Sequence, residues 1–224
     1  GHADGACGAG RGGEDWNQRK QLALAVLRDR TAGRAAVEAA ADALENDGLL
    51  SSASDYTVLI SALGRSRLNG RAMEVLDGMM TKGPQPNVFH FNATISACEA
   101  CGDWQTALLI LRRMQSLGAR PDRISYNAAI SACSKGGEWQ RAVDLLLRMA
   151  PAAADPNVVS FGAAVDACAR AGEWEQALQL LRDMGQLGIG ANLVVLNAAM
   201  GACGRGGAWR AALALLDSME QASV

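Results

Sequence analysis

Side chains that can form several hydrogen bonds recur in this chain at intervals of 35 residues. One column holds Thr57, Asn92, Asn127, Gly162 and Asn197, and a second holds Asn87, Asp122, Asn157 and Asn192. An asparagine amide offers two donors and one carbonyl acceptor. Inside a helix, asparagine costs roughly 0.5 kcal/mol relative to alanine. Three asparagines in one exposed helical column are therefore hard to explain by folding alone, and we interpret them as hydrogen-bonding groups kept for a partner.

The reactive side chains of the sequence do not assemble into a catalytic or metal centre. His2 and His90 are the two histidines, and neither has a partner with the spacing of a nucleophile pair or a metal site. Cys98 and Cys101 form a CxxC motif that lacks a second ligand pair. We therefore expect no enzyme activity, no metal, no cofactor and no small-molecule substrate.

The same interval governs the residues that build the elements. Tryptophan recurs at positions 104, 139, 174 and 209, cysteine at 98, 133, 168 and 203, and methionine at 79, 114, 149, 184 and 219. A fixed period of this size indicates stacked supersecondary units that bury a continuous core between neighbours. We assign the tryptophans and cysteines to that core.

Each unit has the pattern of a helical hairpin. In residues 88–122, apolar spacings predict one helix from about Val88 to Ala100 and a second from Trp104. Gly118 and Pro121 end the second helix, and Asp122 can cap the next one. The chain is thus expected to be an all-α, right-handed solenoid of about six hairpins. The expected units are 18–52 (degenerate), 53–87, 88–122, 123–157, 158–192 and 193–224 (incomplete), after a disordered leader at 1–17.

Composition narrows the class of protein further. No run of about 18 apolar residues is present, so we expect no membrane span. Equivalent cysteines in adjacent repeats lie roughly 10 Å apart, which exceeds the reach of a disulfide, so they indicate a reducing compartment. The net charge of −2 argues against strong non-specific attraction to phosphate.

The period, the helix pair and two phrases resemble the pentatricopeptide repeat family. These phrases are Phe91-Asn-Ala-Thr-Ile-Ser-Ala-Cys98 and Ala119-Arg-Pro-Asp122. The resemblance implies a solenoid that binds single-stranded RNA, together with other RNA-processing proteins, in a mitochondrion or plastid, although the chain shows no targeting segment. The alternative is a protein-interaction scaffold, since other helical solenoids bind peptides on their concave face.

The resemblance also assigns roles to columns. Base-reading residues would be Thr57, Asn87, Asn92, Asp122, Asn127, Asn157, Asn192 and Asn197. In the family, two such residues act on one base. The pair Thr57 and Asn87 would prefer adenine, Asn92 and Asp122 uracil, and Asn127 and Asn157 a pyrimidine, in the order 5′ to 3′. Gly162 offers no side chain, so the fourth unit would tolerate any base. The residues that end each unit, Asn87, Asp122, Asn157 and Asn192, also suit helix N-caps. Base reading and capping are compatible roles for one residue.

Two more columns complete the implied site. Apolar residues that sandwich bases would be Phe89, Ile124, Val159 and Val194, with Ser54 weakening the first step. Phosphate-contacting residues would be Arg65, Lys135, Arg170 and Arg205, interrupted by Ala100. The basic column has a second explanation, because Lys and Arg also stabilise helix C-termini through the helix dipole.

Overall fold

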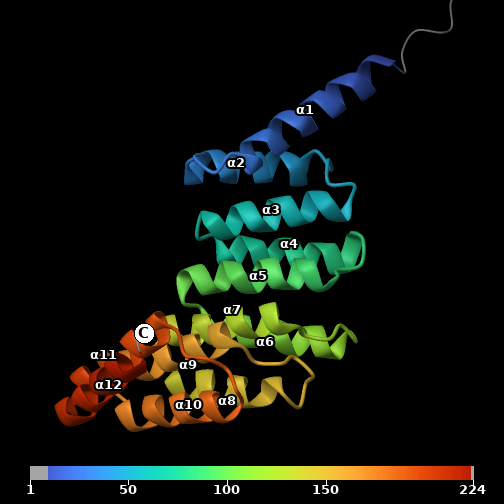
Figure 1. Cartoon of the computed structure of the whole chain (residues 1–224). Coiled ribbons are helices and arrows are strands. Elements are labelled where there is room, and N and C mark those ends of the chain that lie inside the picture. The colour runs from blue at the N-terminus through green and yellow to red at the C-terminus, as the bar shows by residue number, and fades with distance from the viewer. Residues whose placement is uncertain (1–9, 223–224) are drawn as a thin grey trace, which may run out of the picture.

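The computed structural model describes residues 10–222, and all of its regular structure is helical (Figure 1). The helices are α1 (Gly10–Arg28), α2 (Arg34–Asn46), α3 (Ala53–Arg65), α4 (Asn69–Lys82), α5 (Val88–Cys101), α6 (Trp104–Ser116), α7 (Arg123–Lys135), α8 (Trp139–Met149), α9 (Val158–Ala171), α10 (Trp174–Gln186), α11 (Leu193–Arg205) and α12 (Trp209–Ala222). Six successive hairpins form a solenoid, which confirms the expected fold class.

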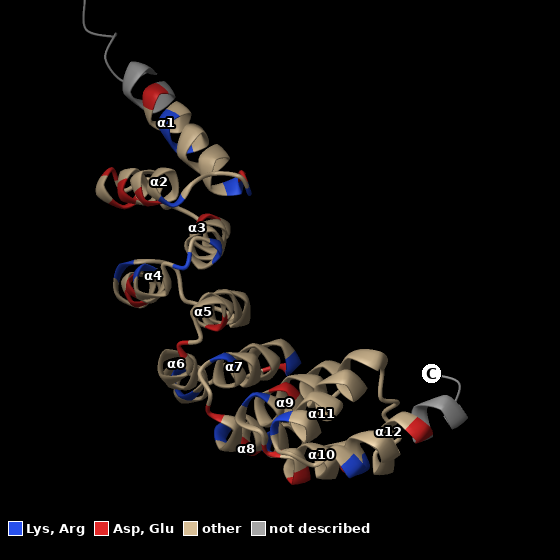
Figure 2. Ribbon diagram, turned by 90° about the vertical axis from the view of Figure 1, so that its left-hand side faces the viewer, with Lys and Arg blue, Asp and Glu red and all other residues tan. Residues whose placement is uncertain are grey.

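The helices form two layers. Each odd-numbered helix from α3 to α9 packs against the next odd-numbered helix, and each one from α3 to α11 packs against its own hairpin partner. Figure 2 shows the array bending toward the odd-numbered helices, which therefore line the inner, concave side. Side chains of the odd-numbered helices that leave the core consequently face a continuous inner surface.

Polar caps start the odd-numbered helices. Asn87, Asp122, Asn157 and Asn192 each accept backbone N–H hydrogen bonds in the first turn of the following helix. Ser52 does the same for α3 through the amide of Asp55. These caps satisfy backbone donors that a helix start leaves unpaired, so the expected capping role of this column is confirmed.

The tryptophan column joins each hairpin to the next. Trp104, Trp139 and Trp174 are partly buried against the core, whereas Trp209, in the last hairpin, is 62% exposed. A Cβ atom built on Gly136 would lie 2.3 Å from Cδ1 of Trp104 and 3.0 Å from the carbonyl oxygen of Gly102. Glycine at the end of α7 thus lets the indole of the preceding repeat pack close to the backbone.

The cysteine column is buried as expected. Cys98, Cys133, Cys168 and Cys203 are all fully buried and unpaired, whereas Cys101 is exposed. Burial raises the pKa of Cys98 and of Cys168 to about 12. Because the thiolate is the reactive form of cysteine, these thiols act as small apolar side chains.

One boundary differs from the expected one. Helix α1 begins at Gly10, inside the segment that the sequence suggests is a leader, and residues 1–9 of that segment lie outside the described residues. Leu24 and Leu27 of α1 are buried against α2 and α3. None of the helices among residues 10–222 is long and apolar enough to cross a membrane.

The close tryptophan–glycine contact predicts a position-specific stability effect. Gly136→Ala should destabilise the fold by about 1–3 kcal/mol, because the added methyl group would overlap both the indole and a backbone carbonyl. Gly78→Ala is the matched control: Gly78 lies inside α4, and a Cβ atom built on it would have no atom of another element within 4 Å. There, alanine should stabilise by about 0.5–1 kcal/mol. Urea unfolding measures both, and equal effects would contradict the packing described.

Candidate nucleic-acid interface

Four exposed apolar side chains mark the inner layer at repeat intervals. Phe89 is 73% exposed, Ile124 61%, Val159 57% and Val194 72%. Each is the second residue of an odd-numbered helix, α5, α7, α9 or α11. The residue three positions later, Asn92 in the case of Phe89, lies on the same helical face. The inner surface therefore repeats one apolar group beside one reading position.

The predicted reading pair of the α5 repeat is joined within the protein. Nδ2 of Asn92 donates to both carboxylate oxygens of Asp122, at 3.1 and 3.3 Å. The hydroxyl of Ser125 donates to Oδ1 of Asn92 at 2.5 Å. Asn92 is only 7% exposed, so the expectation of an exposed column is wrong here. Its amide lies between α5 and α7, because its partners, Asp122 and Ser125, are at the start of α7.

The next repeat keeps part of this arrangement. The hydroxyl of Ser160 lies 2.6 Å from Oδ1 of Asn127 and 3.1 Å from Oδ1 of Asn157. Oδ1 of Asn157 also accepts the backbone N–H groups of Val159 and Ser160. Asn127 is half-buried, and its Nδ2 reaches solvent without a hydrogen bond to the described part of the chain. A donor is therefore available at the inner surface.

The α3 repeat uses a different arrangement. Asn87 caps α5 through its side chain, and its own N–H donates to Nδ1 of His90 at 3.1 Å. Nε2 of His90 contacts the carbonyl oxygen of Ala53 at 2.8 Å, and the hydroxyl of Thr57 donates to the same carbonyl. The predicted pair Thr57 and Asn87 is thus linked indirectly, through His90 and a backbone carbonyl.

The last two reading positions have few constraints. A Cβ atom on Gly162 would lie 3.3 Å from Cγ2 of Val195, the residue that occupies the place of Ser125 and Ser160. Asn192 is exposed and caps α11 by accepting the N–H of Val195 at 3.0 Å. Asn197 is exposed on α11.

A further column emerges from these contacts. We call it the N3 column, because its members are the third residues of successive odd-numbered helices: Asp55, His90, Ser125, Ser160 and Val195. The four polar members accept the backbone N–H of the residue that caps their helix. The N3 column is not among the predicted site residues, although its 35-residue spacing and the capping-box pattern are visible in the sequence.

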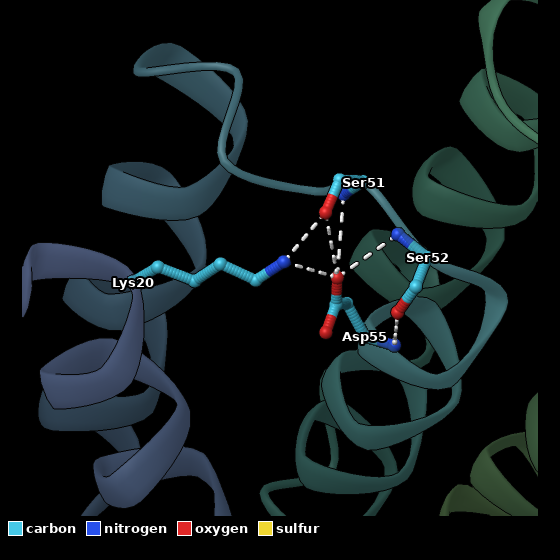
Figure 3. Close-up of polar contacts among 4 residues, drawn as sticks. All are labelled: Lys20, Ser51, Ser52 and Asp55. Carbon is cyan, nitrogen blue, oxygen red and sulfur yellow. Dashed lines mark hydrogen bonds and ion pairs between the residues drawn. The ribbon is translucent and has the colours of Figure 1, made fainter. Parts of the chain in front are cut away.

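The first member of the N3 column is held by a lysine. Nζ of Lys20 in α1 lies 2.7 Å from Oδ2 of Asp55, and both side chains are largely buried (Figure 3). Burial acts to raise the pKa of Asp55, but hydrogen bonds from Lys20, Ser52 and Ser51 keep it below its usual value. Lys20 stands 35 residues before Asp55, so the pair ties the degenerate first hairpin to the array.

All four basic side chains of the predicted phosphate column already bind other residues of this chain. Nη2 of Arg65 donates to the carbonyl of Leu27 at 2.5 Å, and Nε of Arg205 donates to the carbonyl of Ala169. These two arginines therefore bind the last turn of the preceding odd-numbered helix.

The other two basic residues form ion pairs. Lys135 pairs with Glu99 at 3.1 Å, and Arg170 pairs with Asp166 at 2.8 Å. Burial acts to raise the pKa of Asp166, but hydrogen bonds from Arg170 and Ser134 keep it below its usual value. Each cation of the predicted phosphate column is thus paired with a carboxylate or a backbone carbonyl of the protein.

Comparison with protein families identifies the repeat. A profile described as a pentatricopeptide repeat domain matches residues 41–100, 82–138 and 109–164, and one described as a PPR repeat matches residues 159–189 and 194–224. The chain belongs to the pentatricopeptide repeat family. A comparison with curated protein sequences found no significant match.

Solved structures show the same pentatricopeptide repeat fold. The crystal structure of PPR10 from maize is 27% identical, with a TM-score of 0.72 over 91% of this chain and 29% of that one. PPR10 in complex with an 18-nt psaJ RNA element gives 23% identity and a TM-score of 0.64, over 94% of this chain and 37% of that one. The PPR domain of Arabidopsis thaliana protein-only RNase P 1 in complex with tRNA gives 15% and 0.60, over 83% and 93%. This chain therefore spans about a third of the length of PPR10.

Among residues 10–222, no three His, Cys, Asp or Glu side chains are grouped so that they could hold a metal ion. The CxxC pair, Cys98 and Cys101, is divided between the core and the surface. The polar groups at the predicted reading positions are amides, a hydroxyl and a carboxylate, which suit hydrogen bonding to a ligand.

The contacts of the basic column predict unequal roles in stability. Arg205→Ala should destabilise the protein by about 1 kcal/mol, because it removes a charged donor from a carbonyl at the end of α9. Lys135→Ala, the control, should change stability by less than about 0.5 kcal/mol, since its ion pair is exposed to solvent. Thermal unfolding measures both, and an Arg205→Ala variant as stable as the native protein would refute the inter-repeat role.

Proposed function

We propose that this protein is a sequence-selective, single-stranded RNA-binding solenoid that performs no chemistry of its own. Unpaired bases would lie along the odd-numbered helices, one base to a repeat. The observation that carries the proposal is the exposed apolar column, Phe89, Ile124, Val159 and Val194, in which every member is more than half exposed and stands beside a reading position.

The chemistry of an unpaired base fits this surface. A base has a flat apolar face and a polar edge, and proteins bind single strands by stacking on the face and hydrogen bonding to the edge. On this protein the exposed side chains of Phe89 and Ile124 would contact base faces. The amide of Asn127, whose Nδ2 is free for a partner, and the carboxylate of Asp122 would meet base edges.

The family resemblance supplies the finer proposals. Thr57 with Asn87 would prefer adenine, Asn92 with Asp122 uracil, and Asn127 with Asn157 a pyrimidine, so the target would contain 5′-A-U-Y-N. Asn192 would close the fourth unit, which has no side chain at Gly162, and Asn197 would belong to the incomplete last unit. The cellular role would be RNA processing, stability, editing or translation in a mitochondrion or plastid, alongside other RNA-processing proteins. PPR10 and the RNase P domain, both solved with RNA, support the ligand class.

A competition assay tests this function. A labelled 12-mer RNA containing AUC should bind, and an unlabelled 12-mer of the same composition with the order CUA should compete at least fivefold less well. Phe89→Ala should weaken binding about five- to twentyfold, because stacking of one base contributes about 1–3 kcal/mol. Leu147→Ala is the matched control: Leu147 is 65% exposed on the outer helix α8.

Two outcomes would contradict the proposal. Equal competition by the two RNAs would remove sequence selectivity. An equal loss of affinity in the Phe89 and Leu147 variants would remove the inner surface as the binding site. Binding of a peptide ligand to the inner surface without any binding of RNA would favour the scaffold alternative.

The salt dependence of RNA binding tests the phosphate column. A single strand loses affinity with salt at a slope of about −0.7 for each phosphate neutralised. Four cations free to bind phosphate would therefore give a slope of about −2.8 in log affinity against log salt concentration. The four cations of this column already have partners within the protein: Arg65, Lys135, Arg170 and Arg205. We expect a slope shallower than about −1.5 between 50 and 300 mM salt. A slope of −2.8 or steeper would mean that these side chains leave their partners for phosphate.

A further inference from the structure

We propose that Ser125 and Ser160 are positioning residues that fix which edge of Asn92 and Asn127 faces the RNA. Each serine lies in the repeat that follows the asparagine it contacts. This inference rests on the proposed function, because it concerns how the same inner surface distinguishes bases. It makes selectivity at one base depend on three residues, one of them in the N3 column of the next repeat.

The two serines form the same hydrogen-bond relay. The backbone N–H of Asp122 donates to Oγ of Ser125 at 3.1 Å, and that hydroxyl donates to Oδ1 of Asn92. One repeat later, the N–H of Asn157 donates to Oγ of Ser160 at 3.2 Å, and that hydroxyl donates to Oδ1 of Asn127 at 2.6 Å. A hydroxyl has one proton to donate, and each serine has a second acceptor nearby, Oδ1 of its own cap residue, at 3.0 Å for Ser125 and 3.1 Å for Ser160. The amide carbonyl of the preceding repeat is the nearer acceptor in both cases, at 2.5 and 2.6 Å, so we assign the proton to it.

This contact determines what the amide offers to a base. An asparagine amide that is free to flip exchanges its donor and acceptor, and neighbouring groups decide its orientation. With Oδ1 of Asn127 bound by Ser160, Nδ2 is the group left for a ligand. At Asn92, an acceptor-only carboxylate of Asp122 and the hydroxyl of Ser125 fix the same orientation from both sides.

The other members of the N3 column show the contrast. His90 accepts the N–H of its cap residue but directs its second nitrogen to the carbonyl of Ala53, away from the side chain of Thr57. Val195 carries no polar group, and it stands against Gly162, which has no side chain to orient. Serine therefore occurs in this column where the preceding repeat presents asparagine.

A capping role alone predicts a different pattern. Asp55 completes a capping box as well as serine does, through the N–H of Ser52, so helix initiation does not require a hydroxyl at the N3 position. The bond from the hydroxyl to the preceding asparagine adds nothing to the cap. Variants that keep the cap and change this bond separate the two roles.

The first experiment varies Ser160 and measures the affinity for RNAs that differ only at the third base. Ser160→Ala should reduce the pyrimidine preference at that base about fivefold, the equivalent of one hydrogen bond of about 1 kcal/mol. Ser160→Thr keeps the hydroxyl and should keep the preference. Ser160→Asp keeps an acceptor for the N–H of Asn157 but should lose the preference, because a carboxylate cannot donate to Oδ1. Its melting temperature should also fall, because Ser160 is fully buried and faces two amide oxygens. The preference at the second base, which Ser125 controls, should not change.

The second experiment installs the arrangement in the repeat that lacks it. Gly162→Asn alone should gain no preference at the fourth base, because the new side chain presses on Val195 and finds no hydroxyl. Val195→Ser alone should gain none either. The double variant should gain a pyrimidine preference of about fivefold, with the third-base preference unchanged.

The outcomes separate this inference from the proposed function. If the native protein selects AUC but Ser160→Ala keeps its third-base preference, or Gly162→Asn alone matches the double variant, the positioning role is overturned and the proposed function stands. If the native protein shows no preference at any base, the proposed function falls and the positioning role falls with it.

Discussion

The start of each odd-numbered helix is the constraint on which the rest of the structure depends. A helix start leaves backbone N–H groups without partners, and here that start lies in the seam between two repeats. The closing residue of each unit, such as Asp122, satisfies these donors, and the N3 residue, such as Ser125, returns a bond to the closing residue. Both side chains consequently lie beside the amide of Asn92. The contacts that begin one helix thus organise the polar inner surface of the repeat before it.

Much of this architecture follows from the sequence because a strict period repeats local rules. Caps, turn glycines and the 3.6-residue spacing of apolar side chains are local properties, so the hairpins, the N-caps and the buried cysteine column could be predicted. The start of α1 at Gly10 could not, because the first residues of that helix show little apolar periodicity.

Side-chain contacts between adjacent repeats could not be predicted from the sequence either. Asn92 is buried because Asp122 and Ser125 approach it from the next repeat, and spacing along a chain does not give the distance between two stacked helices. The partners of the basic column, Glu99 and Asp166 among them, are specific to single repeats and have no column of their own. Predictions from periodicity thus succeed for residues that every repeat shares and fail where one repeat differs.

In the proposed complex, successive bases contact successive repeats along the inner layer. Site-specific photocrosslinking tests this arrangement most directly: a single 4-thiouridine is placed at the second or third position of the AUC element, and the crosslinked residue is mapped by mass spectrometry. We expect crosslinks near Phe89 and Asn92 for the second position, moving by one 35-residue unit to Ile124 and Asn127 for the third. Crosslinks on α4, α6 or α8, or a crosslink that stays in place when the label moves, would contradict it.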